Sequence, residues 1–309
     1  MPYTGEILAL VVAVLWTFSS LCCEVAAKKE GSVVLNVVRL TIATVAIGIG
    51  LWIATGSPLP TYADKRVWGW LALSSLAGYI IGDYFFLKSF ILIGARFGEL
   101  FMTIAPVAAA FTGWVLLGET MSGKAIAGMF ITIAGICLSI MAPKEGKHLP
   151  VVKLPWKGVV YGLIAGVGQG VGLVFSKQGM LLYQQLIPET ETAMRALMPF
   201  SATLIRCIVG LVGFVAMLFL MRETGRFKEA LHTRRFMAAA SLSAIAGPVI
   251  GVALSLMATL YTTTGATQTI MALVPILILW PSKVFLNATI TQQEIIGACI
   301  AVAGITLLF

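Results

Sequence analysis

One long stretch of this sequence occurs twice, and the duplication limits the folds that the chain can adopt. A shift of 169 positions places residues 94–138 on residues 263–307. The matched positions include Pro106 with Pro275, Gly128 with Gly297 and Gly135 with Gly304. Apolar composition alone seldom aligns proline and glycine in this way. We therefore interpret the chain as an internal duplication, which has to be recognised before a fold is assigned.

The composition is that of a membrane protein. Of the 309 residues, 59% are hydrophobic and only 11% are charged, whereas a soluble domain carries about 25% charged residues. The net charge of +8 lies mostly in the connecting segments, so it relates to orientation and anionic lipid rather than to nucleic acid. The five cysteines fall in apolar stretches and fit neither a disulfide framework nor a zinc site. The lipid bilayer is the expected partner, and no metal or cofactor is expected.

Apolar segments long enough to span a bilayer, about 20 residues each, occur ten times. They are 5–23, 33–54, 67–92, 97–117, 123–141, 158–176, 200–221, 236–260, 266–286 and 294–309. Because each half holds an odd number of spans, the halves must enter the membrane in opposite orientations. The predicted fold is all-α, a polytopic membrane protein with ten transmembrane helices as two inverted five-helix repeats.

Residues 1–142 form the first predicted repeat, 143–156 the connecting loop and 157–309 the second repeat. We expect long polar connections at 143–156 and 222–235, and an extra-membrane loop at 177–199 that contains Pro188. An interfacial helix within 177–199 is left open.

Two local patterns carry structural predictions. Thr291 and Glu294 form a capping box at the start of the last helix. Four glycines spaced by four residues should let the sixth helix approach its neighbours closely. They are Gly158, Gly162, Gly166 and Gly170.

A second group of residues resembles a known family. A central proline is followed by Leu116-Leu117-Gly118-Glu119 and then by a helix with glycines at 128 and 135. This order resembles the EamA-type transporters of the drug/metabolite transporter superfamily, and it covers nearly the whole chain as two five-helix units. The second copy has Asn287-Ala288 in place of Gly118-Glu119. The resemblance implies export or exchange of small metabolites through a central cavity, without ATP hydrolysis.

Asp83 is the first candidate for substrate binding or coupling. It lies about 16 residues into the third helix, well inside the bilayer at about 1.5 Å rise per residue, where an ionisable group is a functional hypothesis by default. The alternative is a structural hydrogen bond to a neighbouring helix. Lys88 and Tyr84 are further candidates. Since Lys88 faces another side of the helix, we leave open that Asp83 pairs with Lys88 of another copy or with Arg39.

Glu99 and Gln268 occupy equivalent positions shortly before the central prolines. Glu99 is a candidate for substrate or proton coupling, because a carboxyl group in a low-dielectric site can bind a proton near neutral pH. The alternative for Glu99 is a cap at the N-terminus of the fourth helix. Trp16 and Gln169, matched by a shift of 153, either face each other across the cavity or simply pack.

Pro106 and Pro275 each remove a helical hydrogen bond, which leaves the carbonyls of Met102 and Met271 without a partner. We predict broken helices that line the transport path. A packing kink without substrate contact is the alternative.

Arg39 and Arg206 are matched and lie about two turns inside their helices. Snorkelling to the interface is the expected role, and a gate salt bridge or a contact to an anionic substrate is the alternative.

These features predict a secondary active transporter of a small molecule that works by alternating access in the plasma membrane. A non-transporting scaffold or sensor is the alternative. An enzyme is not expected, because His148 and His232 both lie in connections and no catalytic motif is present. Basic residues are concentrated in the connections opposite the N-terminus, which places the termini outside, whereas the family resemblance places them inside. A homodimer remains open.

Overall fold

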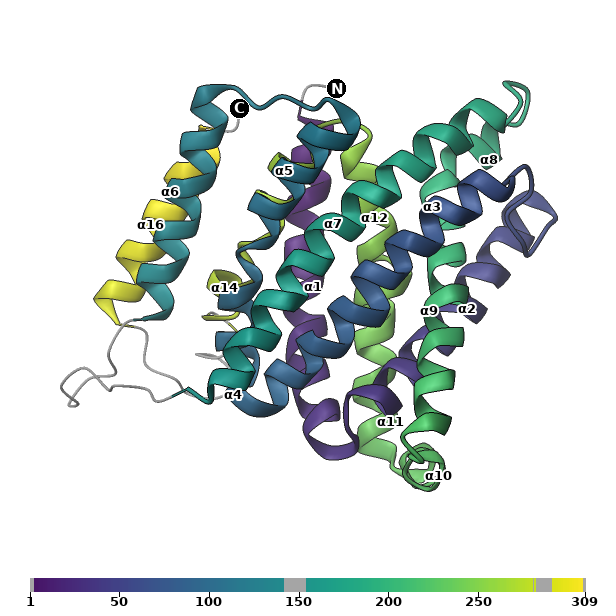
Figure 1. Cartoon of the computed structure of the whole chain (residues 1–309), viewed down its shortest axis with the longest axis horizontal. Coiled ribbons are helices and arrows are strands. Elements are labelled where there is room, and N and C mark those ends of the chain that lie inside the picture. Colours follow the sequence, from purple (N-terminus) through teal and green to yellow (C-terminus); the bar gives the residue numbers. More distant parts are fainter. Residues whose placement is uncertain (1–2, 142–153, 280, 282–290, 308–309) are drawn as a thin grey trace.

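The computed structural model describes residues 3–141, 154–279, 281 and 291–307, and this part of the chain is helical without a strand (Figure 1). Seven of its helices are long and apolar enough to cross a membrane. Three shorter apolar helices accompany them: Ala105–Leu117, Thr264–Leu277 and Gln292–Thr306. The prediction of an all-α, multi-pass membrane protein is confirmed at this level.

The described helices of the two halves follow the same order, with the short helices α8 and α10 added in the second half. The first half holds α1 (Thr4–Glu30), α2 (Ser32–Thr55), α3 (Lys65–Ser75), η1 (Leu76–Asp83), α4 (Tyr84–Met102), α5 (Ala105–Leu117) and α6 (Gly123–Ile140). The second holds α7 (Trp156–Leu186), α8 (Thr192–Ala196), α9 (Met198–Leu220), α10 (Thr224–His232), α11 (Arg234–Ala244), η2 (Ile245–Val249), α12 (Gly251–Thr259), α13 (Thr264–Met271), α14 (Val274–Leu277) and α16 (Gln292–Thr306).

The third helix of each half contains a π-helical segment. The segments η1 and η2 begin at Leu76 and Ile245, which the shift of 169 residues places on each other. In η2, the amide of Ile250 donates to the carbonyl of Ile245 at 3.1 Å, five residues back. Such widened turns are rare and are frequent at functional sites. The duplication is therefore visible in the backbone as well as in the sequence.

The predicted breaks in the proline-containing helices are present in both halves. The helix α4 ends at Met102 and α5 begins at Ala105, so Pro106 stands in a first turn, where its missing N–H breaks no hydrogen bond. In the second half, α13 ends at Met271 and α14 begins at Val274, one residue before Pro275. A role of the two prolines in gating stays a prediction.

The predicted helix ends were wrong at several connections. The helix α7 continues to Leu186, so the first part of the predicted extra-membrane segment 177–199 is helical. Met180 and Tyr183 are buried there, and this packing extends the helix beyond its most apolar part. The predicted polar connection 222–235 likewise holds α10. Hydropathy marks where apolar sequence ends, whereas helices end where their packing and backbone capping end.

Helices 3 and 4 of the prediction, 67–92 and 97–117, are also bounded differently. No loop separates the first from the second, because the chain turns at Gly94 alone, with φ at 79°. Most of the connecting loop 143–156 lies outside the described residues, as do part of 266–286 and the last two residues of 294–309.

The last helices of the two halves, α6 and α16, pack against each other at one side of the molecule (Figure 1). Their glycines form the contact. A methyl group added at Gly128 would lie 2.5 Å from the carbonyl oxygen of Gly304, and one added at Gly135 would lie 2.7 Å from that of Gly297. The earlier glycine of α6 thus meets the later glycine of α16, so the two equivalent helices run antiparallel.

The first helix of each half packs on the third helix of the other half. The helix α1 contacts α11 and α12, and α7 contacts α3 and η1. The glycine stripe of α7 faces α4 and α5: a methyl group at Gly162 would meet Phe101, and one at Gly170 would lie 2.5 Å from the carbonyl oxygen of Ala105. The predicted close packing of this helix is confirmed, and it brings the two halves together around a shared centre.

Candidate functional site between the two halves

A cavity of about 70 Å³ lies where the two halves meet. Its first-half lining is Trp16, Ser19, Ser20, Cys23, Arg39, Tyr79, Asp83, Phe86, Glu99 and Met102, and its second-half lining is Gln169, Gly247, Pro248 and Val252. A neighbouring cavity of about 30 Å³ shares Trp16, Glu99, Met102 and Gln169, and is also lined by Ala105, Gln268, Met271, Ala272, Val274 and Pro275. Together they form what we call the central cavity.

Asp83, the last residue of η1, is buried and held from two sides. One carboxylate oxygen accepts a hydrogen bond of 2.7 Å from Gln169 Nε2, and the other lies 3.7 Å from Arg39 Nη1. Gln169 Nε2 also donates to the carbonyl oxygen of Gly78 at 3.0 Å. The ion pair left open by the sequence, Asp83 with Arg39, is therefore the arrangement found.

The two matched arginines are buried within the protein rather than extended along its surface, so the expectation of snorkelling was wrong. Arg39 is 7% exposed and donates to Asn36 Oδ1 at 3.1 Å besides facing Asp83. Arg206 is 3% exposed and lies over the ring of Tyr79, with its guanidinium carbon 4.6 Å from the ring centroid. A carboxylate and an aromatic face in the interior offer these guanidinium groups partners that compensate for lost hydration.

Equivalent side chains of the two halves meet equivalent glycines. A methyl group at Gly78 would lie 2.9 Å from Arg206 Nη2, and one at the matched Gly247 would lie 2.9 Å from Arg39 Nη2. The glycines thus leave room for a guanidinium group against each π-helical segment.

Gln169 and Trp16 are related in the same way, because each side chain lies against a glycine of the other half. Gln169 lies against Gly82, and Trp16 lies against the matched Gly251. Each side chain comes from the first helix of one half and reaches the third helix of the other. Both also line the central cavity from opposite halves, as one of the sequence interpretations expected.

Glu99 lines both parts of the central cavity and is 6% exposed. It lies in the part of α4 that follows the turn at Gly94, and its carboxylate accepts a hydrogen bond of 2.5 Å from Ser20 Oγ. Among the described residues, no lysine or arginine nitrogen lies within 4 Å of it, since the four ion pairs found there involve other carboxylates. Its repeat equivalent, Gln268, lines the smaller part.

Two predicted site residues lie apart from this group. Lys88 has its ammonium 5.5 Å from the ring centroid of Tyr84, and neither residue lines the central cavity. Tyr84 instead contacts the ring of Phe85 edge-on.

Several lining residues were missed by the sequence analysis, although a signal was present. Ser20 and Cys23 follow Trp16 by four and seven residues, which places all three on one helical face. Tyr79 and Phe86 flank Asp83 in the same way. Helical spacing counted from Trp16 and Asp83 would have predicted these four lining residues. Pro248, which the repeat shift places on Tyr79, offered no such signal because it bears no polar group.

Two further polar clusters tie the fourth helix of the first half to the second half. Glu119, just after α5, accepts from the amide and hydroxyl of Thr264 at 2.8 and 2.6 Å and pairs with Lys177 at 2.6 Å. It thereby caps the start of α13.

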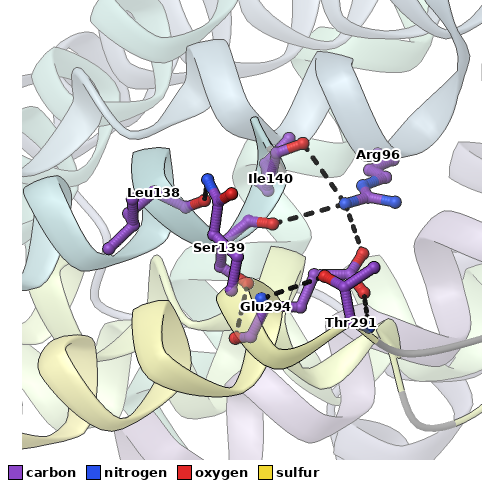
Figure 2. A network of polar contacts seen from close by, with 7 residues as sticks. Arg96, Leu138, Ser139, Ile140, Thr291 and Glu294 are labelled. Atoms are coloured by element: carbon purple, nitrogen blue, oxygen red, sulfur yellow. Dashed lines mark hydrogen bonds and ion pairs between the residues drawn. The ribbon is translucent and has the colours of Figure 1, made fainter. Parts of the chain in front are cut away.

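At the other end of this segment, Arg96 pairs with Glu294 at 2.6 Å and donates to the carbonyls of Ser139 and Ile140 (Figure 2). Glu294 also accepts from the amide of Thr291, whose hydroxyl accepts from the amide of Glu294, so the predicted capping box is confirmed. In the described part of the chain, no three His, Cys, Asp or Glu side chains gather as a metal site.

Comparison with known proteins agrees with this architecture. A family model described as the EamA-like transporter family matches residues 3–141 and again residues 156–309. This chain belongs to the EamA-like transporter family. A solved structure titled "Crystal structure of protein" has the same fold, with a TM-score of 0.70 at 16% identity, over 98% of this chain and 96% of that one. No curated protein matches the sequence. Membership in the EamA-like family, together with the apolar helices, makes the chain an integral multi-pass membrane protein.

Proposed function

We propose that this EamA-like chain is a secondary active transporter that exports or exchanges a small metabolite across the plasma membrane by alternating access. The observation that supports this most is the central cavity, because its walls come from equivalent positions of both halves. A pocket at the interface of two repeats can open to either side when one repeat rocks against the other. We further propose ten spans in two inverted repeats, with residues 1–142 and 157–309 as the units.

The described helices support that topology. Seven long and three shorter apolar helices correspond to the ten predicted spans, and the antiparallel contact of α6 with α16 is what inverted repeats require of equivalent helices. The broken helices support the proposal in a second way. Irregular backbone is tolerated at membrane depth where it is covered by protein or lines a hydrated cavity, and Met102 and Pro275 beside the two breaks line the central cavity.

Buried charge supports a ligand-binding protein rather than a purely structural scaffold. Burying an ion pair such as Arg39 with Asp83 often stabilises a fold no better than apolar packing. Its place beside a cavity therefore points to a use in binding. No catalytic reaction is proposed.

The test begins with the purified protein and a thermal-shift screen of amino acids, nucleosides, sugars and cationic drugs, since a ligand of the folded state raises its apparent stability. Uptake of each stabilising compound into proteoliposomes is then measured. We expect flux above that of protein-free liposomes. A compound that stabilises the protein but is never moved would favour a sensor instead.

Asp83→Asn is the variant that links flux to the cavity. We expect it to lower flux at least tenfold while the purified yield persists, because an interaction of about 1.4 kcal/mol already changes an equilibrium tenfold. The matched substitution Val252→Asn adds an amide at the equivalent uncharged position and controls for the new polar group. Equal flux in wild type and Asp83→Asn would remove Asp83 from the mechanism.

A further inference from the structure

The short helix α10 has no counterpart among the described residues of the first half. The shift of 169 residues places it on residues 55–63, where Pro58 and Pro60 stand and no helix forms. The segment 222–235 around α10 also carries five basic and two acidic residues, against two basic and one acidic in the matched segment 53–66. The added helix therefore brings added positive charge, at the end of the molecule opposite the start of α1 (Figure 1).

Helix α10 lies across the end of the helix bundle. Figure 1 shows it end-on below α9 and α11, which run along the plane of the picture. Ala230 is buried and Phe227 packs against the core, whereas Lys228 is exposed. Just before α10, at the end of α9, Phe219 and Leu220 are 65% and 82% exposed. Such apolar side chains of a membrane protein contact lipid tails, so the amphipathic helix that follows them lies at the depth of the lipid head groups.

The basic side chains around α10 have no acidic partner in the described part of the chain. We call them the α10 patch: Lys29, Arg222, Arg226, Lys228, Arg234 and Arg235, all of them exposed. None takes part in the four ion pairs of the described residues, although Glu223 and Glu229 belong to the same segment. The fold adds the end of α1 to this group, because Arg226 Nη1 lies 3.5 Å from where a methyl group on Gly31 would be. Basic groups gathered in this way attract an anion.

Arg222 occupies a position that favours glycine. Its φ of 57° lies in the left-handed region, which is unfavourable for a residue with a Cβ atom. Its amide donates to the carbonyl of Phe219, and the amide of Glu223 donates to that of Leu218, which is the pattern of a helix end that usually holds glycine. The equivalent helix α2 does end in a glycine, Gly56, with φ at 76°. An arginine at the end of α9 therefore has to be explained by its charge rather than by its fit to the backbone.

We propose that the α10 patch binds the head group of an anionic phospholipid, with the acyl chains along Phe219 and Leu220. Guanidinium groups present several donors that match phosphate oxygens, and basic groups near a membrane surface attract anionic lipid. Free phosphate or an acidic peptide would meet the same charges but would gain nothing from the apolar end of α9, so the ligand is the lipid. The site concerns what holds this end of the protein in the bilayer, and it does not rest on the transport function proposed above.

The binding test uses the full-length protein in a neutral detergent. Native mass spectrometry gives the dissociation constants of phosphatidylglycerol and of phosphatidylcholine with the same acyl chains. We expect phosphatidylglycerol to bind roughly a hundredfold more tightly, because three basic groups on one head group contribute a factor of about five each. The preference should shrink as ammonium acetate screens the charges. Phosphatidylglycerol should also raise the melting temperature more than phosphatidylcholine does.

Two double variants with the same loss of charge locate the site. Arg226→Gln with Lys228→Gln should weaken phosphatidylglycerol binding about 25-fold, a factor of about five for each basic group, and should leave phosphatidylcholine binding unchanged. The control is Lys65→Gln with Arg66→Gln, which removes two charges at the other end of the molecule and should alter neither affinity.

Arg222→Gly separates lipid binding from folding. Without lipid, its melting temperature should equal or exceed that of the wild type, because glycine adopts the left-handed conformation without a steric cost. Its affinity for phosphatidylglycerol should nevertheless fall about fivefold. A purely structural arginine would give the opposite pattern, with a lower melting temperature and an unchanged affinity for the lipid.

Any of four results would overturn the proposal. Equal affinity for the two lipids, or equal losses in the two double variants, would mean that the α10 patch is not a lipid site. Stabilisation by inorganic phosphate equal to that by phosphatidylglycerol would leave an anion site without a lipid. Stabilisation by polyglutamate in place of phosphatidylglycerol would make the patch a surface for acidic proteins.

Discussion

The two halves of the chain share a backbone design and differ in charge. Their π-helical segments and helix breaks begin at positions related by the same shift of 169 residues. Where the first half carries Asp83 and Glu99, however, the second carries Val252 and Gln268. The π-helical segments and helix breaks that shape the cavity thus occur in both halves. The acidic side chains that line it occur only in the first half. A cavity can therefore be nearly symmetric in form while its chemistry belongs to one side.

Substitution of the matched arginines should give the largest difference in unfolding free energy between the halves. Arg39→Leu leaves Asp83 buried without its cation, and removal of one partner of a buried pair costs about 3–5 kcal/mol of unfolding free energy. The matched Arg206→Leu removes a contact to Tyr79, and a desolvated cation–π contact contributes about 2 kcal/mol. Chemical unfolding in detergent measures both.

A double variant separates charge from packing at this site. Arg39→Leu combined with Asp83→Asn should recover much of the stability lost in Arg39→Leu, because no unpaired charge then remains. Equal costs for Arg39→Leu and Arg206→Leu, or no recovery in the double variant, would mean that the two arginines act only through their volume.

The glycines that receive Trp16 and Gln169 provide a smaller test. A methyl group at Gly251 would lie 2.6 Å from Trp16 Nε1, whereas one at Gly82 would lie 3.2 Å from Gln169 Nε2. Overpacking in a filled interior costs about 1–3 kcal/mol, so Gly251→Ala should lower the melting temperature more than Gly82→Ala. Gly69→Ala, in a helix with open space, is the control and should be neutral or slightly stabilising. A larger loss of melting temperature in Gly82→Ala than in Gly251→Ala would contradict this expected difference between the halves.

The smallest difference lies at the start of the third helix of each half. Asp64 caps α3 by accepting from the amides of Arg66 and Val67, whereas its repeat equivalent Thr233 makes no capping bond to α11. Loss of a capping side chain costs about 1 kcal/mol. Asp64→Ala should therefore destabilise the protein measurably in thermal unfolding, and Thr233→Ala should change little. An equal loss of thermal stability in Asp64→Ala and Thr233→Ala would show that Thr233 caps its helix in solution.

What could be predicted from the sequence depended on local rules. The helix breaks before Pro106 and Pro275 follow from a missing N–H, and the capping box of Thr291 and Glu294 follows from spacing alone. The glycine stripe of α7 similarly predicted close contact, although not the helices that it contacts. Apolar stretches found the helices but not their ends, because α7 continues to Leu186 through packing that hydropathy does not record.

The candidate site was predicted only in part for the same reason. Trp16, Asp83, Glu99, Gln169 and Gln268 all line the central cavity, as do Arg39 and Pro275. The partners of these residues come from distant helices, however, and no spacing rule predicts that Ser20 would meet Glu99 or that Lys177 would meet Glu119. The burial of Arg206 likewise depends on the ring of Tyr79 lying beneath it.

The segment from Arg96 to Glu119 is held to the second half at both of its ends and is interrupted between them. Arg96 pairs with Glu294 of α16, and Glu119 contacts Thr264 of α13 and Lys177 of α7. The interruption, which we call the joint, lies between Met102 and Ala105 beside the central cavity. Because the helix is interrupted at that joint, a bend there would move the backbone next to Glu99 without breaking the contacts at either end. We expect the loss of one set of contacts to free only the part of the segment on its own side of the interruption.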